Sequence, residues 1–145
     1  MIKSNKNRSK ILLIRVSKIL KNKIKNKKIC FLGVTFKANT DDMRESSSLN
    51  MIPFLSKKGA KINYYDPSGE KQEFAKIKNV IFCNNIKEAC RNVDLIIIHT
   101  EWEEFKALDF NKLCKKDKFK IFDMRNLYSH ELMKKKGFRY YSIGR

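Results

Sequence analysis

The sequence predicts an α/β fold: an open parallel sheet of about six strands with helices on both faces, preceded by a basic amphipathic helix. Three observations support this prediction. After residue 28, short apolar runs alternate with helical segments, which is typical of right-handed βαβ units. The run 95–98 is unbroken by polar residues, as expected of a central parallel strand covered on both faces. The 145 residues, 42% of them hydrophobic, suffice for one domain with an appendage.

The first 26 residues predict a helical arm. Residues 1–28 contain no acidic side chain, and apolar residues recur at helical spacing. These apolar residues are Leu12, Val16, Ile19, Leu20 and Ile24. Three interpretations compete: an arm that packs on a missing or partner domain, a membrane-surface or targeting helix, and a disordered tail. The apolar stripe and the short linker into the next strand favour the docking arm, so we divide the chain into residues 1–26 and 27–145.

Residues that start or stop helices and strands delimit the remaining elements. Gly59 ends a helix, and Asp66 with Pro67 stops a strand. The predicted strands are 29–33, 61–65, 80–83, 94–100, 119–123 and 138–143. The predicted helices are 47–58, 86–92 and 130–136. Ligands of open parallel sheets gather at the carboxyl ends of the strands, near the point where the strand order reverses. The loops after the strands are therefore the places to look for a site.

The loop after the first strand reads GVTFK, from Gly33 to Lys37. It differs from the dinucleotide fingerprint G-x-G-x-x-G, because one glycine cannot supply the tight turn, the close backbone approach and the helix packing together. We therefore do not expect the principal NAD site here. Lys37 beside Phe36 offers a point charge for a phosphate or an anionic reaction centre, next to an apolar plate. A solvated lysine beside a core phenylalanine is the alternative, which these two residues alone favour.

Residues 39–48 are denser in polar side chains than a loop usually is. The serines at 46–48 are expected to cap the following helix, and Asp41 or Asp42 to orient Arg44. An oriented arginine near a helix amino terminus can clamp a diphosphate. The alternative is an ordinary capping network with a surface ion pair.

Arg125 follows the fifth predicted strand, in the run FDMRN. Together with Lys37 and Arg44 it would bring two arginines and one lysine to one edge of the sheet from separate loops. Such a convergence suits a diphosphate-linked ligand.

The formal net charge of +18 would ordinarily indicate a polyanionic partner. Here lysine greatly outnumbers arginine, and asparagine and isoleucine are also frequent, which indicates a compositional drift on every solvated face. Nucleic-acid readers tend to use forked arginine contacts and interleaved aromatic residues. We expect no specific nucleic-acid partner, and only weak nonspecific adhesion.

Cysteine usage and hydropathy exclude other classes of protein. There is no C-x-x-C pair, and the two histidines form no zinc-ligand cluster with cysteine, so no metal site is expected. The four cysteines predict core thiols in a reducing, cytoplasmic compartment: Cys30 and Cys83 on strands, Cys90 and Cys114 on helices. Apolar runs fall far short of the ~20 residues of a membrane span, and no signal peptide is evident.

Five blocks of the sequence resemble, in order, the carboxy-terminal domain of the UDP-glucose 6-dehydrogenase family, the UDP-glucose/GDP-mannose dehydrogenases. They are GVTFKANTDDMRESSS, GAKINYYDP, VDLIIIHTEWEEF, IFDMRNLY and GFRYYSIGR. The resemblance covers about residues 27–145, and the block 100–105 is more typical of the UDP-glucose branch than of GDP-mannose relatives. Residues 1–25 resemble more loosely the helix that leads into this domain. The resemblance implies a Rossmann-like, UDP-sugar-binding domain.

The resemblance also implies roles for four residues. Phe36 and Lys37 match positions that contact the nucleotide sugar, with Lys37 assisting near the reacting end. Arg125 matches an arginine that engages the substrate, and Arg44 one that touches NAD from across the interdomain cleft. Ser47 stands where many relatives have proline.

The family reaction that this resemblance implies oxidises UDP-glucose to UDP-glucuronate with two NAD and covalent thiol chemistry midway. The NAD-binding Rossmann domain and the segment with the catalytic cysteine are missing from this sequence. We therefore expect the chain to bind UDP-glucose and close the cleft, but to be inactive by itself. The missing amino-terminal and central domains could be a separate chain, and the full enzyme is expected to be a homo-oligomer. The alternatives are a non-catalytic or decayed nucleotide-binding remnant and a basic, nonspecific nucleic-acid-binding protein.

Overall fold

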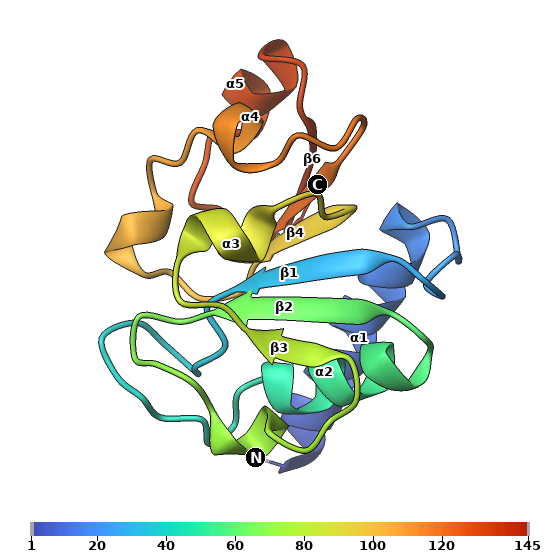
Figure 1. Cartoon of the computed structure of the whole chain (residues 1–145), viewed down its shortest axis with the longest axis vertical. Helices are drawn as coiled ribbons and strands as arrows, with labels where there is room; N and C mark the ends of the chain where they lie inside the picture. Colours follow the sequence, from blue (N-terminus) through green and yellow to red (C-terminus); the bar gives the residue numbers. More distant parts are fainter. Residues whose placement is uncertain (1, 145) are drawn as a thin grey trace.

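The structure is a computed structural model that describes residues 2–144, with side chains from residue 7 onward (Figure 1). Its longer helices are α1 (Ile2–Ile19) and α2 (Ser48–Lys57), and its shorter ones are α3 (Ile86–Cys90), α4 (Phe110–Leu113) and α5 (His130–Lys135). The strands are β1 (Lys28–Leu32), β2 (Lys61–Tyr65), β3 (Val80–Phe82), β4 (Leu95–Ile98), β5 (Lys120–Asp123) and β6 (Arg139–Ser142). Each predicted strand and helix is present; the bounds differ by a few residues, except that the amino-terminal helix ends at Ile19 and not at residue 26.

All six strands form one parallel sheet in the order β3-β2-β1-β4-β5-β6. The chain builds outward from β1 in one direction through β3, then returns to the other side of β1 to place β4. The strand order therefore reverses between β1 and β4, which is where open α/β sheets bind ligands. The predicted fold class is confirmed.

Alternate residues of the central strands face opposite layers of helices. On β1, Ile29 and Phe31 are buried with residues of α1 and α2, whereas Cys30 and Leu32 are buried with residues of α3, α4 and α5. Figure 1 shows the same division, with α3 on one side of the sheet and α1 and α2 on the other. The unbroken apolar run of β4 lies between β1 and β5 and is fully buried, as expected for a strand covered on both faces.

The apolar stripe of α1 packs on the chain's own sheet. Leu12, Val16, Ile19 and Leu20 are at most 5% exposed and belong to the same core as β1 and α2. The prediction that this helix docks on a missing or partner domain is wrong for this face. The reason is that α2 covers only the β1–β2 side of this face of the sheet, and α1 packs next to α2 over β5. There the guanidinium of Arg15 lies 5.2 Å from the centre of the Phe122 ring. The division of the chain at residue 26 remains a prediction.

The four cysteines are free thiols. Cys30 lies in β1 and Cys90 ends α3, whereas Cys83 and Cys114 lie directly after β3 and α4 and outside the elements predicted for them. Cys30, Cys90 and Cys114 are buried in the core, and Cys83 is half-buried. No helix within residues 2–144 is long and apolar enough to cross a bilayer.

Candidate functional site

The loops after β1, β4 and β5 meet at the carboxyl edge of the sheet, at the switch point between β1 and β4. They surround a cavity of about 310 Å³, whose wall includes Phe36, Lys37 and Arg125. The structure thus brings together three of the four predicted site residues. The cavity is also lined by Arg8, Glu45, Ser47 and Glu101. A larger cavity of about 500 Å³ between α4 and α5 has Lys136 as its one basic lining residue, so the switch-point cavity suits an anion better.

The loop after β1 is shaped by a glycine and a buried carboxylate. Gly33 has φ +83°, and a Cβ there would lie 2.6 Å from the Cβ of Thr100, so only glycine fits this turn. Asp66, which follows β2 and is 1% exposed, accepts hydrogen bonds from the backbone N–H groups of Val34 (2.8 Å) and Thr35 (3.3 Å). With its start fixed in this way, the loop turns outward and leaves Phe36 40% exposed.

The serines at the start of α2 cap the helix only in part: the Ser46 hydroxyl accepts the backbone N–H of Ser48 at 3.3 Å. Ser47 is the N-cap residue, but its side chain makes no capping hydrogen bond. Instead the hydroxyls of Ser46 and Ser48 both donate to the carbonyl oxygen of Val34, each at 2.6 Å. Since that carbonyl lies in the loop after β1, the two serines hold the loop against the start of α2.

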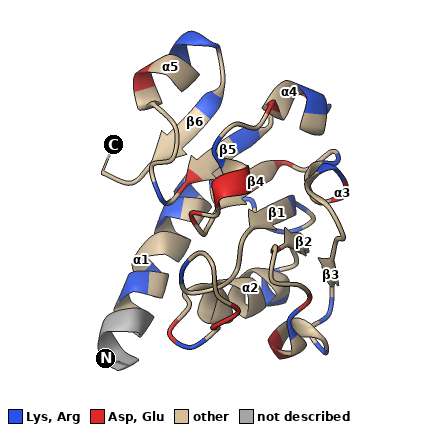
Figure 2. Cartoon of the chain, turned by 90° about the vertical axis from the view of Figure 1, so that its left-hand side faces the viewer, with Lys and Arg blue, Asp and Glu red and all other residues tan. Residues whose placement is uncertain are grey.

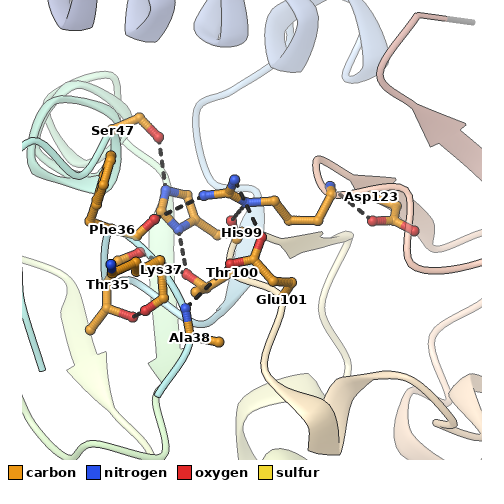
Figure 3. Close-up of polar contacts among 10 residues, drawn as sticks. Thr35, Phe36, Lys37, Ala38, Ser47, His99, Thr100, Glu101 and Asp123 are labelled. Carbon is orange, nitrogen blue, oxygen red and sulfur yellow. Dashed lines mark hydrogen bonds and ion pairs between the residues drawn. The ribbon is translucent and has the colours of Figure 1, made fainter. Parts of the chain in front are cut away.

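Ser47, His99 and Thr100 form a chain of hydrogen bonds at the back of the site (Figure 3). The Thr100 hydroxyl donates its single proton to the carbonyl oxygen of Thr35 at 2.9 Å, so it must accept from Nδ1 of His99, 2.9 Å away. His99 is then protonated on Nδ1, and its Nε2 accepts from the Ser47 hydroxyl at 2.8 Å. The last of these bonds belongs to the neutral imidazole; a charged ring would instead donate from Nε2 to the Ser47 oxygen, so the hydrogen bonds fix the Nδ1 proton and burial decides the charge.

Burial supports the same protonation state. His99 is 1% exposed, and its pKa is lowered to about 3, first by burial and then by the positive charges of Arg125 and Arg8. Because the pKa is depressed in the folded state, the unfolded chain binds the extra proton between about pH 6.5 and pH 3. The contribution of His99 to stability is therefore present above the ordinary histidine pKa and is lost progressively as the pH falls below it.

We expect the wild-type chain to lose about 2 kcal/mol of stability through His99 between pH 7 and pH 5. Urea unfolding at the two pH values, compared with the same pair of measurements on His99→Gln, isolates this loss, because the carboxylates contribute equally to both proteins. Equal losses in the two proteins would contradict a buried, neutral His99.

Arg125 holds three loops together. Its Nε donates to the carbonyl oxygen of His99 at 2.9 Å and its Nη2 to that of Phe36 at 3.0 Å. Its Nη1 lies 3.4 Å from a carboxylate oxygen of Glu101. The guanidinium therefore joins the ends of β1, β4 and β5, while 23% of the side chain stays exposed at the cavity. Burial lowers the pKa of Arg125, and the Glu101 carboxylate opposes that shift.

Asp42, one of the two partners predicted for Arg44, orients the arginine. Its Nε and Nη2 donate to the two carboxylate oxygens of Asp42 at 3.1 and 3.3 Å. The hydrogen bonds from Arg44 are the main cause that lowers the pKa of Asp42. The Arg44 side chain is 89% exposed and is not part of the cavity wall. The structure thus leaves this fourth predicted residue outside the cavity that the other three line.

Several site residues were missed by sequence reasoning. Asp66 and His99 directly follow β2 and β4, and Glu101 lies three residues past the end of β4, so the rule that singled out Lys37 and Arg125 could have found them. Glu101 also accepts a hydrogen bond from the backbone N–H of Ala38 at 3.3 Å. Arg8 had no such signal, because it is one basic residue among many and reaches the cavity from α1.

Comparison with known proteins identifies the family. Residues 30–130 match the model of the UDP-glucose/GDP-mannose dehydrogenase family, UDP binding domain. The chain belongs to the UDP-glucose/GDP-mannose dehydrogenase family. It is 39% identical over 147 residues to the UDP-glucose 6-dehydrogenase of Rickettsia felis, and the alignment covers 99% of this chain and 33% of the relative. It is also 39% identical to the UDP-glucose 6-dehydrogenase of Rhizobium meliloti, with 97% and 32% covered.

A solved dehydrogenase has the same fold. The NDP-N-acetyl-D-galactosaminuronic acid dehydrogenase of Methanosarcina mazei Go1 superimposes with a TM-score of 0.76 and 26% identity, over 96% of this chain and 29% of that one. This chain therefore spans about a third of the length of the dehydrogenases that it matches.

Proposed function

We propose that this chain is the nucleotide-sugar-binding part of a UDP-glucose 6-dehydrogenase, the enzyme that oxidises UDP-glucose to UDP-glucuronate with two NAD. One observation carries the proposal: in a member of this family, the cavity at the switch point of the sheet has Lys37, Arg125 and Arg8 in its wall, three cations against the carboxylates of Glu45 and Glu101. Cationic side chains beside an exposed aromatic ring, Phe36, match the charge of a diphosphate and the flat face of a base or sugar.

Each residue has a separate part in the proposed site. Lys37 assists at the reacting end of the nucleotide sugar, where its ammonium group stabilises developing negative charge. Arg125 grips the substrate from the position at which it already fixes the three loops. Phe36 supplies the apolar wall. The hydrogen-bonded side chains of Ser47, His99 and Thr100 act as a positioning network. They hold the carbonyl of Thr35, which directly precedes the Phe36–Lys37 pair.

The residues of this chain do not fit a complete NAD site, because the loop after β1 has a single glycine and Asp66 occupies its backbone N–H groups. We therefore assign NAD binding mainly to an amino-terminal domain outside residues 1–145, with a contribution from the exposed guanidinium of Arg44 across the cleft. The thiol chemistry is assigned to the same missing part. The free thiols of the core suit a reducing compartment, and we propose a cytoplasmic enzyme that assembles as a homo-oligomer.

Binding of UDP-glucose by this chain alone is expected to be weak, with a Kd of about 1 mM or more, because part of the ligand's contacts would come from other domains. Titration with UDP-glucose, followed by amide NMR shifts, should perturb residues 33–37, 99–101 and 125, and Lys37→Ala should remove the effect. Lys57→Ala, on the exposed end of α2, is the charge-matched control and should behave as wild type. Shifts confined to other loops would contradict the proposed site.

A further inference from the structure

A second concentration of positive charge lies at the amino edge of the sheet, opposite the candidate site. A cavity of about 420 Å³ opens between the turn after α1 and the first residues of β5 and β6. In Figure 2 the end of α1 lies beside β5 and β6, and basic positions recur on these elements. The basic residues that line the cavity are Lys21, Lys23, Lys27, Lys118, Lys120 and Arg139. We call this cavity the amino-edge basin.

The acidic residues of the basin do not balance these charges. Asp94 and Asp117 are its acidic lining residues. Asp94 is already paired, since its carboxylate lies 2.9 Å from the ammonium group of Lys116 and accepts the backbone N–H of Lys28 at 2.8 Å. Lys116 is outside the basin wall. Six cationic side chains therefore face one uncommitted carboxylate, that of Asp117.

The cations lie close enough to repel one another. Lys120 and Arg139 are paired positions at the starts of β5 and β6. The Lys120 ammonium donates to the carbonyl oxygen of Ile19 at 2.7 Å, at the carboxyl end of α1. Its pKa is lowered first by burial and then by the charges of Lys21, Lys27 and Arg139. An anion in the basin would relieve this repulsion.

The backbone at the rim is also unusual for lysine. Lys21 has φ 54° and Lys118 has φ 61°, in the left-handed region, where glycine or asparagine is the ordinary choice and other side chains cost roughly 1–2 kcal/mol. Both lysines line the basin. Unfavourable backbone conformations tend to cluster at functional sites. Two lysines with this conformation beside one cavity therefore support a binding role for it.

We propose that the amino-edge basin binds a short phosphate chain of two or three phosphates, free or carried by a nucleoside. Lysine ammonium groups are compact point charges suited to phosphate oxygens. No aromatic side chain lines the basin, so stacking of bases, which single-stranded nucleic acids use, has no surface there. The basin and the candidate site lie at opposite ends of the parallel strands, so this proposal stands independently of the proposed dehydrogenase function.

The test is calorimetric titration of the chain with tripolyphosphate at 0.15 M salt. The double variant Lys23→Gln/Lys118→Gln should weaken the affinity at least fivefold. Lys57→Gln/Lys135→Gln removes the same charge from exposed residues at the ends of α2 and α5, and should weaken it less than twofold. NMR shifts should map to residues 20–27, 118–120 and 139. Equal weakening by both double variants, no binding at millimolar concentration, or shifts only at the switch-point cavity would overturn the proposal.

Two further ligands identify the source of the phosphates. ATP that binds as tightly as tripolyphosphate supports recognition of the chain alone, and ATP that binds more tightly, with the same loss in the basin variant, supports a nucleoside carrier. A single-stranded oligonucleotide that displaces tripolyphosphate and binds more tightly per phosphate would overturn the proposal in favour of a nucleic-acid surface.

Discussion

Replacing Lys37 by alanine should lower kcat by about 100-fold or more in a dehydrogenase that contains this chain, since loss of one preorganised donor to developing negative charge costs about that much. The structure places Lys37 in the loop after β1. Gly33, Asp66, Ser46 and Ser48 hold the start of this loop in place. A donor carried by a loop held in this way can act on the transition state and not only on binding, so kcat should fall together with kcat/KM.

The measurement is steady-state kinetics on a fusion of this chain to the amino-terminal part of the Rickettsia felis relative. Lys57→Ala and Lys135→Ala serve as controls and should stay within about twofold of wild type, because exposed charges contribute little and are screened. If all three variants lost the same activity, bulk charge and not a site would explain the effect. Circular dichroism of each variant checks that the fold is retained.

Arg125→Lys should reduce kcat/KM roughly ten- to a hundredfold in the same fusion, equivalent to about 1.5–3 kcal/mol. The guanidinium serves the carbonyls of His99 and Phe36 and the carboxylate of Glu101 at once, and an ammonium group cannot reproduce that planar fork. Because part of the loss is positional, the KM for UDP-glucose should rise and the NMR signals of residues 33–37 should broaden. A variant with wild-type KM and unchanged loop signals would show that Arg125 has neither role.

The sheet was predictable because its signal is local. The apolar runs of β1, β4 and β5 and the breaks at Gly59 and Asp66 identify strands and helices without long-range information. The partner of α1 was not predictable in the same way. A helix with one apolar stripe must bury it, but the stripe does not tell whether the surface that receives it belongs to the same chain.

The site was predicted in part for the same reason. Phe36, Lys37 and Arg125 were predicted to meet because the carboxyl ends of parallel strands share one edge, and they line one cavity; their roles remain predictions. The role of the serines at 46–48 was predicted only in part, because capping is the common use of a serine there, whereas the hydroxyls of Ser46 and Ser48 also donate to the carbonyl of Val34 in the loop after β1. The protonation state of His99 depends on burial, on the Ser47 hydroxyl and on the Thr35 carbonyl that takes the Thr100 proton, and none of these is visible from the residues next to His99.

The central claim is that this chain is one part of a dehydrogenase, with a working nucleotide-sugar site and without the oxidation machinery. The most direct test is NADH formation from UDP-glucose and NAD, measured with the purified chain alone and with the separately produced amino-terminal two-thirds of the Rickettsia felis relative added. The account predicts no NADH from either part alone and turnover when they are mixed. The Lys37→Ala variant of this chain should again lower the rate of NADH formation in the mixture. Turnover by the chain alone would contradict it, as would a mixture that stays inactive although the two parts bind each other.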